Sequence, residues 1–458
     1  MPLHFPGKQK AFFVLLIIVV VAGYLCFAGL SGAPRDFNVV LITIDALRAD
    51  HLGCYGYKRD TSPNIDALAR EGTLCTQAIA QSSHTPTSFG VITSSTYPPE
   101  NQLRGWGDTL APALPTLPKI LKSRGWRTIF ASNNIHFRGG LHGFDKGFDE
   151  FYDERAPASV LTQKVSGFFD RGGSKPFFLW VHYMDVHEYA SPKEFAGLFM
   201  GDRLYNKQNK LPIVQSARGH YGRNGIPEFR AEENGWVDNP DYYVALYDGA
   251  VRYVDAQVGL LLEHLREISK RKDLLVLLTA DHGELLGEHG FYFHHGAFLY
   301  EPLIKVPFIL RGPDFPAGRI DTQISAGLDI LPTILSALKI KKPASAQGVA
   351  LMPPPTKSIA GSSYVLSDEA YTRTSVRTES WKLIRFSTEE GLSETYRLFN
   401  LKTDPGETKD LVSVERVRFE ILKEKLDAYR EKFAGTKPSP STLSEETRAG
   451  LKALGYLQ

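Results

Sequence analysis

The chain has 458 residues, of which 43% are hydrophobic and 23% are charged, with 53 Lys and Arg against 51 Asp and Glu. The near balance of charge argues against a dedicated nucleic-acid-binding protein, and the composition excludes intrinsic disorder and a collagen-like repeat. Three cysteines are too few for a disulfide scaffold or for a zinc site built from cysteines. The length suits one large globular domain with a smaller one beside it.

An uncharged apolar segment, AFFVLLIIVVVAGYLCFAGL, occupies residues 11–30 and follows Lys8 and Lys10. Twenty helical residues span the roughly 30 Å hydrocarbon core of a bilayer, and the two lysines predict that residues 1–10 lie in the cytoplasm. A retained transmembrane anchor and a cleaved signal peptide both fit. The lack of a clear small-x-small cleavage site favours the anchor. Either interpretation predicts a catalytic domain outside the cytoplasm, in the periplasm or the extracellular space.

Apolar runs suited to the buried strands of a parallel sheet recur along the chain. They occupy residues 37–44, 127–131, 176–181, 273–279 and 306–310. Helical patterns separate these runs. Ser62 and Pro63 predict the start of one helix and Gly72 its end. Two further helices are expected at 117–124 and at 243–266, the latter with Leu260, Leu261 and Leu265 on one side. This alternation predicts an α/β fold with a doubly wound, mostly parallel sheet flanked by helices.

Two departures from this alternation predict the domain organisation. Residues 191–241, within a catalytic domain at 36–350, are polar, aromatic and rich in Arg and Lys. They are interpreted as a lid or specificity insertion, with a solvated surface excursion as the alternative. After the prolines at 353–355, short antiparallel strands (364–367, 374–378, 381–385) and a helix at 414–433 predict a small α+β subdomain at 360–433. A tail at 434–458 completes the chain.

Cys54 and Cys75 are the only cysteines beyond the apolar segment. An oxidising compartment would allow them to form a disulfide if their distance permits it. Two buried free thiols are the alternative, and the sequence leaves both open.

Acidic and histidine side chains follow three of the predicted strands. Asp45 follows the first strand, Asp281 and His282 follow the strand at 273–279, and the strand at 176–181 runs into a segment that contains His187. Another histidine pair, His294-His295, comes shortly after. Ligands of open α/β sheets bind outside the carboxyl ends of the strands, and carboxylates with imidazoles suit a divalent cation. The sequence therefore predicts a metal-dependent site.

Longer stretches of the sequence resemble the sulfatase family of the alkaline phosphatase superfamily. They occur in family order within about residues 37–412: VLITIDALRADHLGCYGY, SSHTPTSFGVITSSTYPP, FLWVHYMDVHEY, YDGAVRYVDAQVG, LTADHGELLGEHG, HHGAFLYEPLIKVP, WKLIR and LFNLKTDPGETKDL. The resemblance implies one divalent metal ion held by Asp45, Asp281, His282 and the nucleophile. Ca²⁺ is the ion expected from the family, while an imidazole ligand leaves Mn²⁺ or Zn²⁺ open. The second acid often found in the first motif is replaced by Ala46.

The nucleophile motif departs from the family pattern. Typical sulfatases carry Cys or Ser in a C/S-x-P-x-R motif that is converted to formylglycine, and neither version occurs in this chain. Counting back from Tyr97-Pro98 places Thr85 at the nucleophile position. Formylglycine is therefore not expected. A Thr85 hydroxyl bound to a divalent cation would have a lowered pKa and could attack phosphorus or sulfur. The alternatives are a role for Thr85 in starting a helix, and a poorer register that places His84 there.

The resemblance also suggests roles for other polar residues. His187 and His295 match family histidines that donate a proton to the leaving oxygen or hold the anionic group, and which does which stays open. His294 is interpreted as a neighbour of the site and His182 as structural. Asn133 falls at a lysine of the usual sulfate pocket, and its amide could donate to the substrate.

These observations predict a metal-dependent hydrolase of sulfate or phosphate esters, with an anionic ester as substrate and Thr85 as nucleophile. One alternative is a transferase that passes the phosphoryl or sulfuryl group to a glycan or lipid of the cell envelope. Another is a catalytically silent binding protein.

Overall fold

The computed structural model describes residues 35–105, 107–169, 175–211, 237–269, 273–351, 364–369, 372–388 and 393–436. The predicted cytoplasmic segment, the predicted membrane segment, the tail beyond residue 436 and residues 212–236 of the predicted insertion lie outside these ranges. Within them, no helix has the length and apolar character needed to cross a bilayer.

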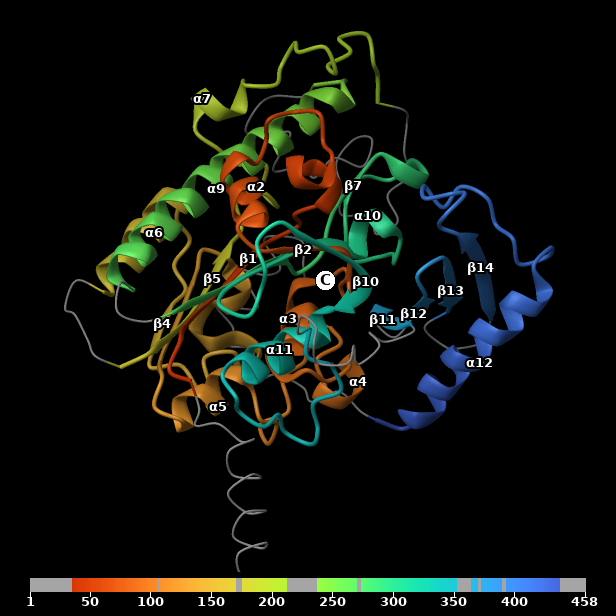
Figure 1. Cartoon of the computed structure of the whole chain (residues 1–458). Coiled ribbons are helices and arrows are strands. Elements are labelled where there is room, and N and C mark those ends of the chain that lie inside the picture. Colours follow the sequence, from red (N-terminus) through yellow and green to blue (C-terminus); the bar gives the residue numbers. More distant parts are fainter. Residues whose placement is uncertain are drawn as a thin grey trace, which may run out of the picture.

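An eight-stranded sheet forms the centre of the large domain, in the order β10-β2-β9-β6-β1-β5-β3-β4 (Figure 1). The strands are β1 Asn38–Ile44, β2 Thr73–Ile79, β3 Arg127–Ser132, β4 Glu150–Tyr152, β5 Phe177–Tyr183, β6 Leu274–Ala280, β9 Lys305–Arg311 and β10 Arg319–Ala326. All neighbouring pairs are parallel except those that β9 makes with β2 and β6. The predicted mostly parallel sheet is thus confirmed, and β9 is its one reversed strand.

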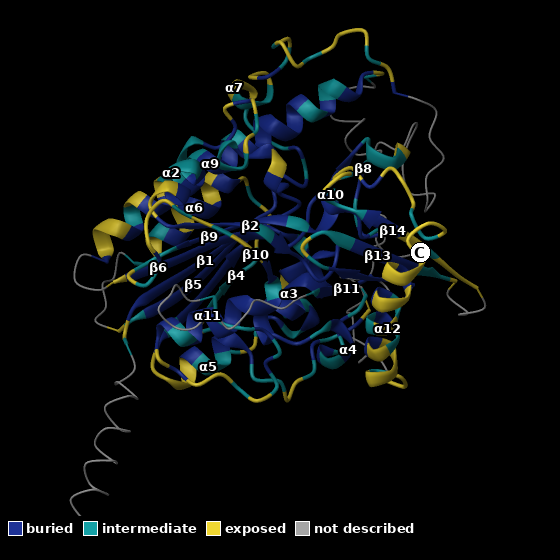
Figure 2. Cartoon of the chain, turned by 45° about the vertical axis from the view of Figure 1, so that its right-hand side comes forward, coloured by how far each residue is buried: buried dark blue, intermediate teal, exposed yellow. Residues whose placement is uncertain are grey.

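Helices cover both faces of this sheet (Figure 2). The bounds are α2 Pro63–Arg70, α6 Ala158–Gly167 and α9 Pro240–Ile268 on one face, and α3 Thr85–Ser94, α5 Leu117–Ser123 and α11 Ile330–Ala337 on the other. Every residue of β1, β5 and β6 is buried, as expected for apolar strands covered on both sides. In α9, Leu261 and Leu265 are buried, but Leu260 is 55% exposed because it lies about 100° around the helix from Leu261.

A smaller antiparallel sheet, β11-β12-β13-β14, forms the C-terminal subdomain with one long helix packed on it. The bounds are β11 Val365–Glu369, β12 Arg373–Arg377, β13 Trp381–Ser387, β14 Glu394–Asn400 and α12 Arg416–Lys432. Leu366, Val376, Leu383, Leu422 and Leu426 contribute to its own hydrophobic core. The predicted small α+β subdomain is confirmed, with β14 as an additional strand.

A buried group of four charged residues joins the two parts of the molecule, and we refer to Glu301, Arg377, Lys382 and Glu407 as the interface cluster. Glu301 begins α10 (Glu301–Ile304) of the large domain. Its carboxylate lies 3.2 Å from both Arg377 and Lys382, and Lys382 Nζ lies 2.9 Å from Glu407. Burial opposes ionisation of Glu301, but Lys382 and Arg377 hold its pKa at about 2. Burial raises the pKa of Glu407 to about 7 despite Lys382.

Cys54 and Cys75 are both free thiols. The structure therefore matches the second of the two alternatives left open by the sequence, with Cys75 buried on β2 and Cys54 half-buried.

Candidate active site

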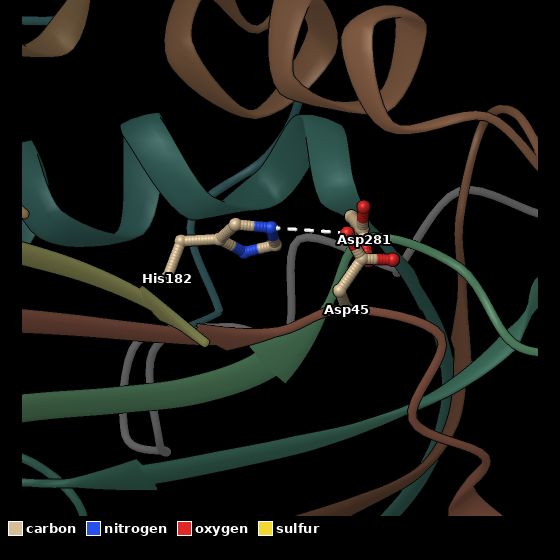
Figure 3. A group of neighbouring side chains, drawn as sticks. All are labelled: Asp45, His182 and Asp281. Carbon is tan, nitrogen blue, oxygen red and sulfur yellow. Dashed lines mark hydrogen bonds and ion pairs between the residues drawn. The ribbon is translucent and has the colours of Figure 1, made fainter. Parts of the chain in front are cut away.

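The sheet brings the predicted ligands together because three parallel strands end at the same edge. Ile44, the last residue of β1, lies opposite Tyr183 of β5 and Ala280 of β6. Asp45 and Asp281 follow these strand ends directly, and Figure 3 shows their carboxylates beside one another with the ring of His182 directed at them.

The two carboxylates have oxygens that no group of the described chain satisfies. Asp45 and Asp281 are fully buried, and neither Asp45 Oδ1 nor Asp281 Oδ2 has a hydrogen-bond partner in the described residues. One ligand atom each from Asp45, His182 and Asp281 lie within 4.8 Å of one another. Such converging, unsatisfied oxygen atoms together with imidazole nitrogen fit a divalent cation.

The electrostatics of the site also favour a cation. Burial, and then the nearby charge of Asp281, raise the pKa of Asp45 well above its usual value. In the described residues, the ion-pair partners of Asp45 and Asp281 are histidines, at 3.3–3.6 Å, rather than Lys or Arg. A bound divalent cation would compensate this buried negative charge, which costs free energy when it is left alone.

His282 presents one particular nitrogen to the site. Its Nδ1 lies 2.9 Å from the carbonyl oxygen of Gly283, so this nitrogen donates a proton there and Nε2 faces Asp45 and Asp281. Burial alone would lower the pKa of His282, but the nearby carboxylates of Asp281 and Asp45 raise it. The net effect is a raised pKa. Gly283 is required at this turn because a Cβ would lie 2.0 Å from the carbonyl oxygen of Pro302.

Thr85 lies beside Asp45 and His282, although β2, the strand that precedes it in the chain, is not a neighbour of β1. It is the first residue of α3, with Pro86 after it, and it is 3% exposed. Its Oγ1 lies 3.2 Å from His282 Nε2 and 3.4 Å from Asp45 Oδ2. The predicted nucleophile and the three predicted ligand residues Asp45, Asp281 and His282 are therefore in one cluster.

The two predicted acid–base residues lie next to this cluster. His187 Nε2 and His295 Nε2 are 3.2 Å apart. The ring of His295 stacks on that of His282 with centroids 4.6 Å apart, and His295 Nδ1 lies 3.3 Å from Glu284 Oε1. Glu284 is fully buried. It was not singled out from the sequence, although it follows Asp281 and His282 by only a few residues.

His182, interpreted from the sequence as structural, reaches the group of residues that could hold a metal ion. Its Nε2 lies 3.3 Å from Asp45 Oδ2, and its Nδ1 lies 2.9 Å from Thr43 Oγ1. Burial lowers its pKa to about 4, so the ring is neutral near pH 7 and has a lone pair available. Strand register could have indicated this position, because His182 lies near the end of β5, beside β1, and is opposite Thr43, two residues before Asp45.

Two adjacent asparagines after β3 differ in what they contact. The predicted substrate contact, Asn133, uses its amide for structural bonds: it donates to Asp185 at 2.7 Å and accepts from the backbone N–H of Met184 at 2.9 Å. Asn134 instead donates to Asp45 Oδ2 at 2.6 Å. The amide that faces the cluster is thus one residue further along than expected.

One buried arginine links the described part of the predicted insertion to α9 of the large domain, and Phe195, Met200 and Leu211 of the insertion pack in or against the hydrophobic core. Asp202 accepts two hydrogen bonds from Arg59, at 2.7 and 2.9 Å, and Arg59 also binds Asp248 of α9 at 2.8 Å. A role of this insertion in substrate choice stays a prediction.

Comparisons with known proteins agree with this geometry. The family model described as Sulfatase matches residues 37–340, and a model described as N-sulphoglucosamine sulphohydrolase, C-terminal, matches residues 287–432. The chain is 23% identical to the uncharacterized sulfatase YidJ of Escherichia coli, over 85% of each protein. It is also 23% identical to an N-acetylglucosamine-6-O-sulfatase of Bacteroides thetaiotaomicron, over 82% of each. Among solved structures, the phosphonate monoester hydrolase of Agrobacterium radiobacter is similar, with a TM-score of 0.68, 17% identity, and 87% of this chain and 96% of that chain covered.

Proposed function

Because the chain belongs to the sulfatase family, we propose that it is a divalent-metal-dependent hydrolase of sulfate or phosphate esters in which Thr85 is the nucleophile. The observation that carries the proposal is the position of Thr85 Oγ1, within 3.4 Å of both Asp45 and His282 at the edge of the sheet. A threonine with only a helix-starting role has no need to lie beside a buried carboxylate and a buried imidazole.

Asp45, Asp281 and His282 would hold the cation together with Thr85, and His182 lies where it can support Asp45. A divalent cation in such a site lowers the pKa of a hydroxyl and offsets the negative charge of the ester group. The unsatisfied oxygens of Asp45 and Asp281 support this assignment.

The reaction needs two displacements. In the first, Thr85 Oγ1 forms a bond to sulfur or phosphorus, the ester bond to the leaving oxygen breaks, and the Thr85 proton passes to a water molecule. His187 or His295, as an imidazolium, gives a proton to the leaving oxygen, which departs as an alcohol. In the second, water attacks the sulfur or phosphorus and gives a proton to the histidine that became neutral in the first step. The bond to Thr85 breaks, the Thr85 oxygen takes a proton from solvent, and sulfate or phosphate is released.

Formylglycine has no place in this mechanism. It arises when the β-carbon of Cys or Ser is oxidised to an aldehyde, whereas the β-carbon of Thr85 also carries a methyl group and would give a ketone. The hydroxyl itself must therefore attack. The proposed mechanism therefore requires no oxidative modification of the Thr85 side chain.

The comparisons support both ester classes. One relative is a sulfatase of a sulfated sugar, and a structurally similar protein is a phosphonate monoester hydrolase. We therefore propose an anionic ester substrate and leave the choice between sulfur and phosphorus to experiment.

The test compares initial rates of the full-length protein on matched aryl sulfate, phosphate monoester, phosphodiester and phosphonate monoester substrates. Each is measured with Ca²⁺, Mn²⁺ or Zn²⁺, for the wild type, Thr85→Ala and Thr87→Ala. Thr87 is the matched control because it is a buried threonine of the same helix whose hydroxyl has no hydrogen-bond partner in the described residues.

We expect Thr85→Ala to lower kcat by about 10³-fold or more and Thr87→Ala to retain the wild-type rate. Mass spectrometry of quenched wild-type protein should find one sulfuryl or phosphoryl group on the peptide that contains Thr85. The proposal fails if Thr85→Ala turns over like the wild type, or if no divalent ion supports hydrolysis of any of these esters.

A further inference from the structure

We propose that Glu369, in the C-terminal subdomain, is a positioning residue that holds the segment 80–84 and thereby sets the place of the Thr85 hydroxyl. The inference rests on the proposed role of Thr85 as nucleophile. It assigns the C-terminal subdomain a part in the active site, although none of its residues belongs to the metal-binding group.

The carboxylate of Glu369 is the acceptor for successive donors of this segment. Its Oε2 accepts hydrogen bonds from Ser82 Oγ at 2.7 Å, from the backbone N–H of Ser83 at 3.0 Å and from Ser83 Oγ at 2.9 Å. All three residues are fully buried. Water cannot replace these bonds, so a loss of the carboxylate leaves buried donors without an acceptor.

The two residues of β11 that precede Glu369 contact the same segment. Ser367 Oγ donates to the carbonyl oxygen of Ala80 at 2.8 Å. The backbone N–H of Asp368 donates to the carbonyl oxygen of Gln81, also at 2.8 Å. The contacts of Glu369 with the next two residues complete the series. Three consecutive residues of one domain therefore fix four consecutive residues of the other.

The position of the segment in the sheet explains why such support matters. The segment follows β2 in the chain. In the sheet, β9 lies between β2 and β6, the strand that Asp281 directly follows. The large domain contacts the beginning of the segment, where Ala80 N–H donates to Ile304 at 2.7 Å and Gln81 Oε1 accepts from Leu328. Ser83, two residues before Thr85, instead donates both its backbone N–H and its hydroxyl to Glu369 of the C-terminal subdomain.

The segment also lies against the loop that carries His295. Glu369 Oε1 is 3.9 Å from His84 Nδ1, and a Cβ on Gly296 would lie 3.5 Å from the His84 ring. Displacement of Ser83 and His84 would thus shift Thr85 relative to His295. Misplacement of a reacting group by about 1 Å can lower a rate by about 100-fold.

The experiment compares Glu369→Ala and Glu369→Gln with Glu407→Gln in the full-length protein. Glu407 is a matched control because it is also a fully buried glutamate of the C-terminal subdomain that accepts a backbone N–H of the large domain, from Glu301 at 2.6 Å. It does not contact the segment before Thr85 in any hydrogen bond or ion pair of the described residues. Three quantities are measured: kcat and KM, bound metal, and backbone hydrogen exchange of peptides from residues 80–88.

We expect Glu369→Ala to lower kcat by about 100-fold, with KM changed less than threefold and the bound metal retained. Glu369→Gln keeps an acceptor oxygen and should recover about tenfold of this loss, which a general loss of stability would not produce. Exchange of peptides from residues 80–88 should accelerate in Glu369→Ala but not in Glu407→Gln.

Two results overturn the inference: a fall in kcat no greater for Glu369→Ala than for Glu407→Gln, or unchanged exchange at residues 80–88. Should Glu369→Ala fail to fold, Glu369→Gln carries the same comparison at the smaller expected effect. A wild type that hydrolyses no ester would contradict the proposed function, and hydrogen exchange would still decide whether Glu369 orders the segment.

Discussion

The molecule buries two groups of charge that differ in one respect. In the interface cluster, two glutamates are matched by Lys382 and Arg377, at 2.9–3.2 Å. In the site cluster, which consists of Asp45, Asp281 and His282, the carboxylates have only histidines as ion-pair partners in the described residues. The pKa directions of Glu301 and Asp45 differ accordingly, because Lys382 and Arg377 hold that of Glu301 at about 2 whereas burial and Asp281 raise that of Asp45 well above its usual value. Glu407 does not share this contrast, since burial raises its pKa to about 7 despite Lys382.

Burial of charge alone therefore does not indicate a functional site. A balanced group such as the interface cluster joins two domains and leaves no need for a ligand. An unbalanced group with unsatisfied oxygens stores unfavourable electrostatic free energy that a cation can relieve. This comparison makes opposite predictions for substitutions in the two clusters.

The largest effect is expected from Asp281→Asn. The variant keeps an acceptor for the backbone N–H of His282 but removes one negative charge from the site. We expect bound metal to fall and kcat/KM to drop by roughly 10⁴-fold, while the metal-free protein becomes no less stable because repulsion with Asp45 is relieved. Metal analysis, kinetics and thermal unfolding in EDTA measure these changes. Asp314→Asn, whose carboxylate pairs with Arg35 at a half-buried position, is the control. A metal-free variant much less stable than the wild type would contradict the comparison.

The interface cluster should respond in the opposite way. Lys382→Met removes a fully buried ammonium group and leaves Glu301 and Glu407 close together without it. Breaking such a buried pair costs about 3–5 kcal/mol of folding free energy, whereas kcat per folded molecule and bound metal should stay near wild-type values. Denaturant unfolding measures the loss. Lys382→Met combined with Glu407→Gln should recover part of it, and a loss below about 1 kcal/mol would show that the cluster is not a structural joint.

The effect of added metal on the unfolding temperature should also distinguish the site cluster from the interface cluster. A divalent ion present at 100 times its dissociation constant stabilises a protein that binds it only when folded by about 2.7 kcal/mol. We expect the unfolding temperature of the wild type and of Lys382→Met to rise with metal and to fall back with EDTA. Asp281→Asn should not respond. Equal responses of all three proteins would place the bound ion elsewhere.

The smallest effect concerns an isolated buried base that belongs to neither cluster. Burial lowers the pKa of His142 to about 4, although its Nδ1 donates to the backbone carbonyl oxygen of Asp108 at 2.7 Å. The unfolded chain binds a proton below pH 6.5 and the folded chain does not until about pH 4, so stability is complete near pH 7 and falls as the pH decreases through this window. At pH 5 the loss is about 2 kcal/mol.

The variant His142→Asn removes this titration and suits the positive φ of 62° at this position. The difference in unfolding temperature between pH 7 and pH 5 should therefore be smaller than in the wild type. An unchanged difference would mean that other groups dominate the acid response.

In the central sheet, the strands that the sequence predicts are those with mainly buried residues. The run at β1 is fully buried and mostly apolar, and so are β5 and β6. β2 and β10 were not predicted because TLCTQAI and RIDTQISA mix polar with apolar residues, as expected for strands toward the edge of a sheet that are partly exposed. β14 has its first four residues outside the core and gives an equally weak signal.

The site could be predicted in part, because residues that directly follow buried strands have a fixed place. Asp45, Asp281 and His282 are of this kind, and the structure brings them together with Thr85. The roles of Asn133 and Asn134 could not be separated, since the direction of a side chain just beyond a strand depends on how the chain turns. Glu369 lies 286 residues after Ser83 in sequence, and no local pattern connects the two.

The reversed strand β9 has a consequence for the order in which a nascent chain becomes active. β2, which leads into Thr85, pairs only with β9 and β10 in the described sheet, and both are synthesised more than 220 residues later. β11, which contacts the segment before Thr85, follows later still. Because domains form as the ribosome delivers them, N-terminal parts first, Thr85 leaves the ribosome long before the strands that fix its place. An unfinished chain therefore carries the proposed nucleophile without the strands and the segment contacts that hold it in place.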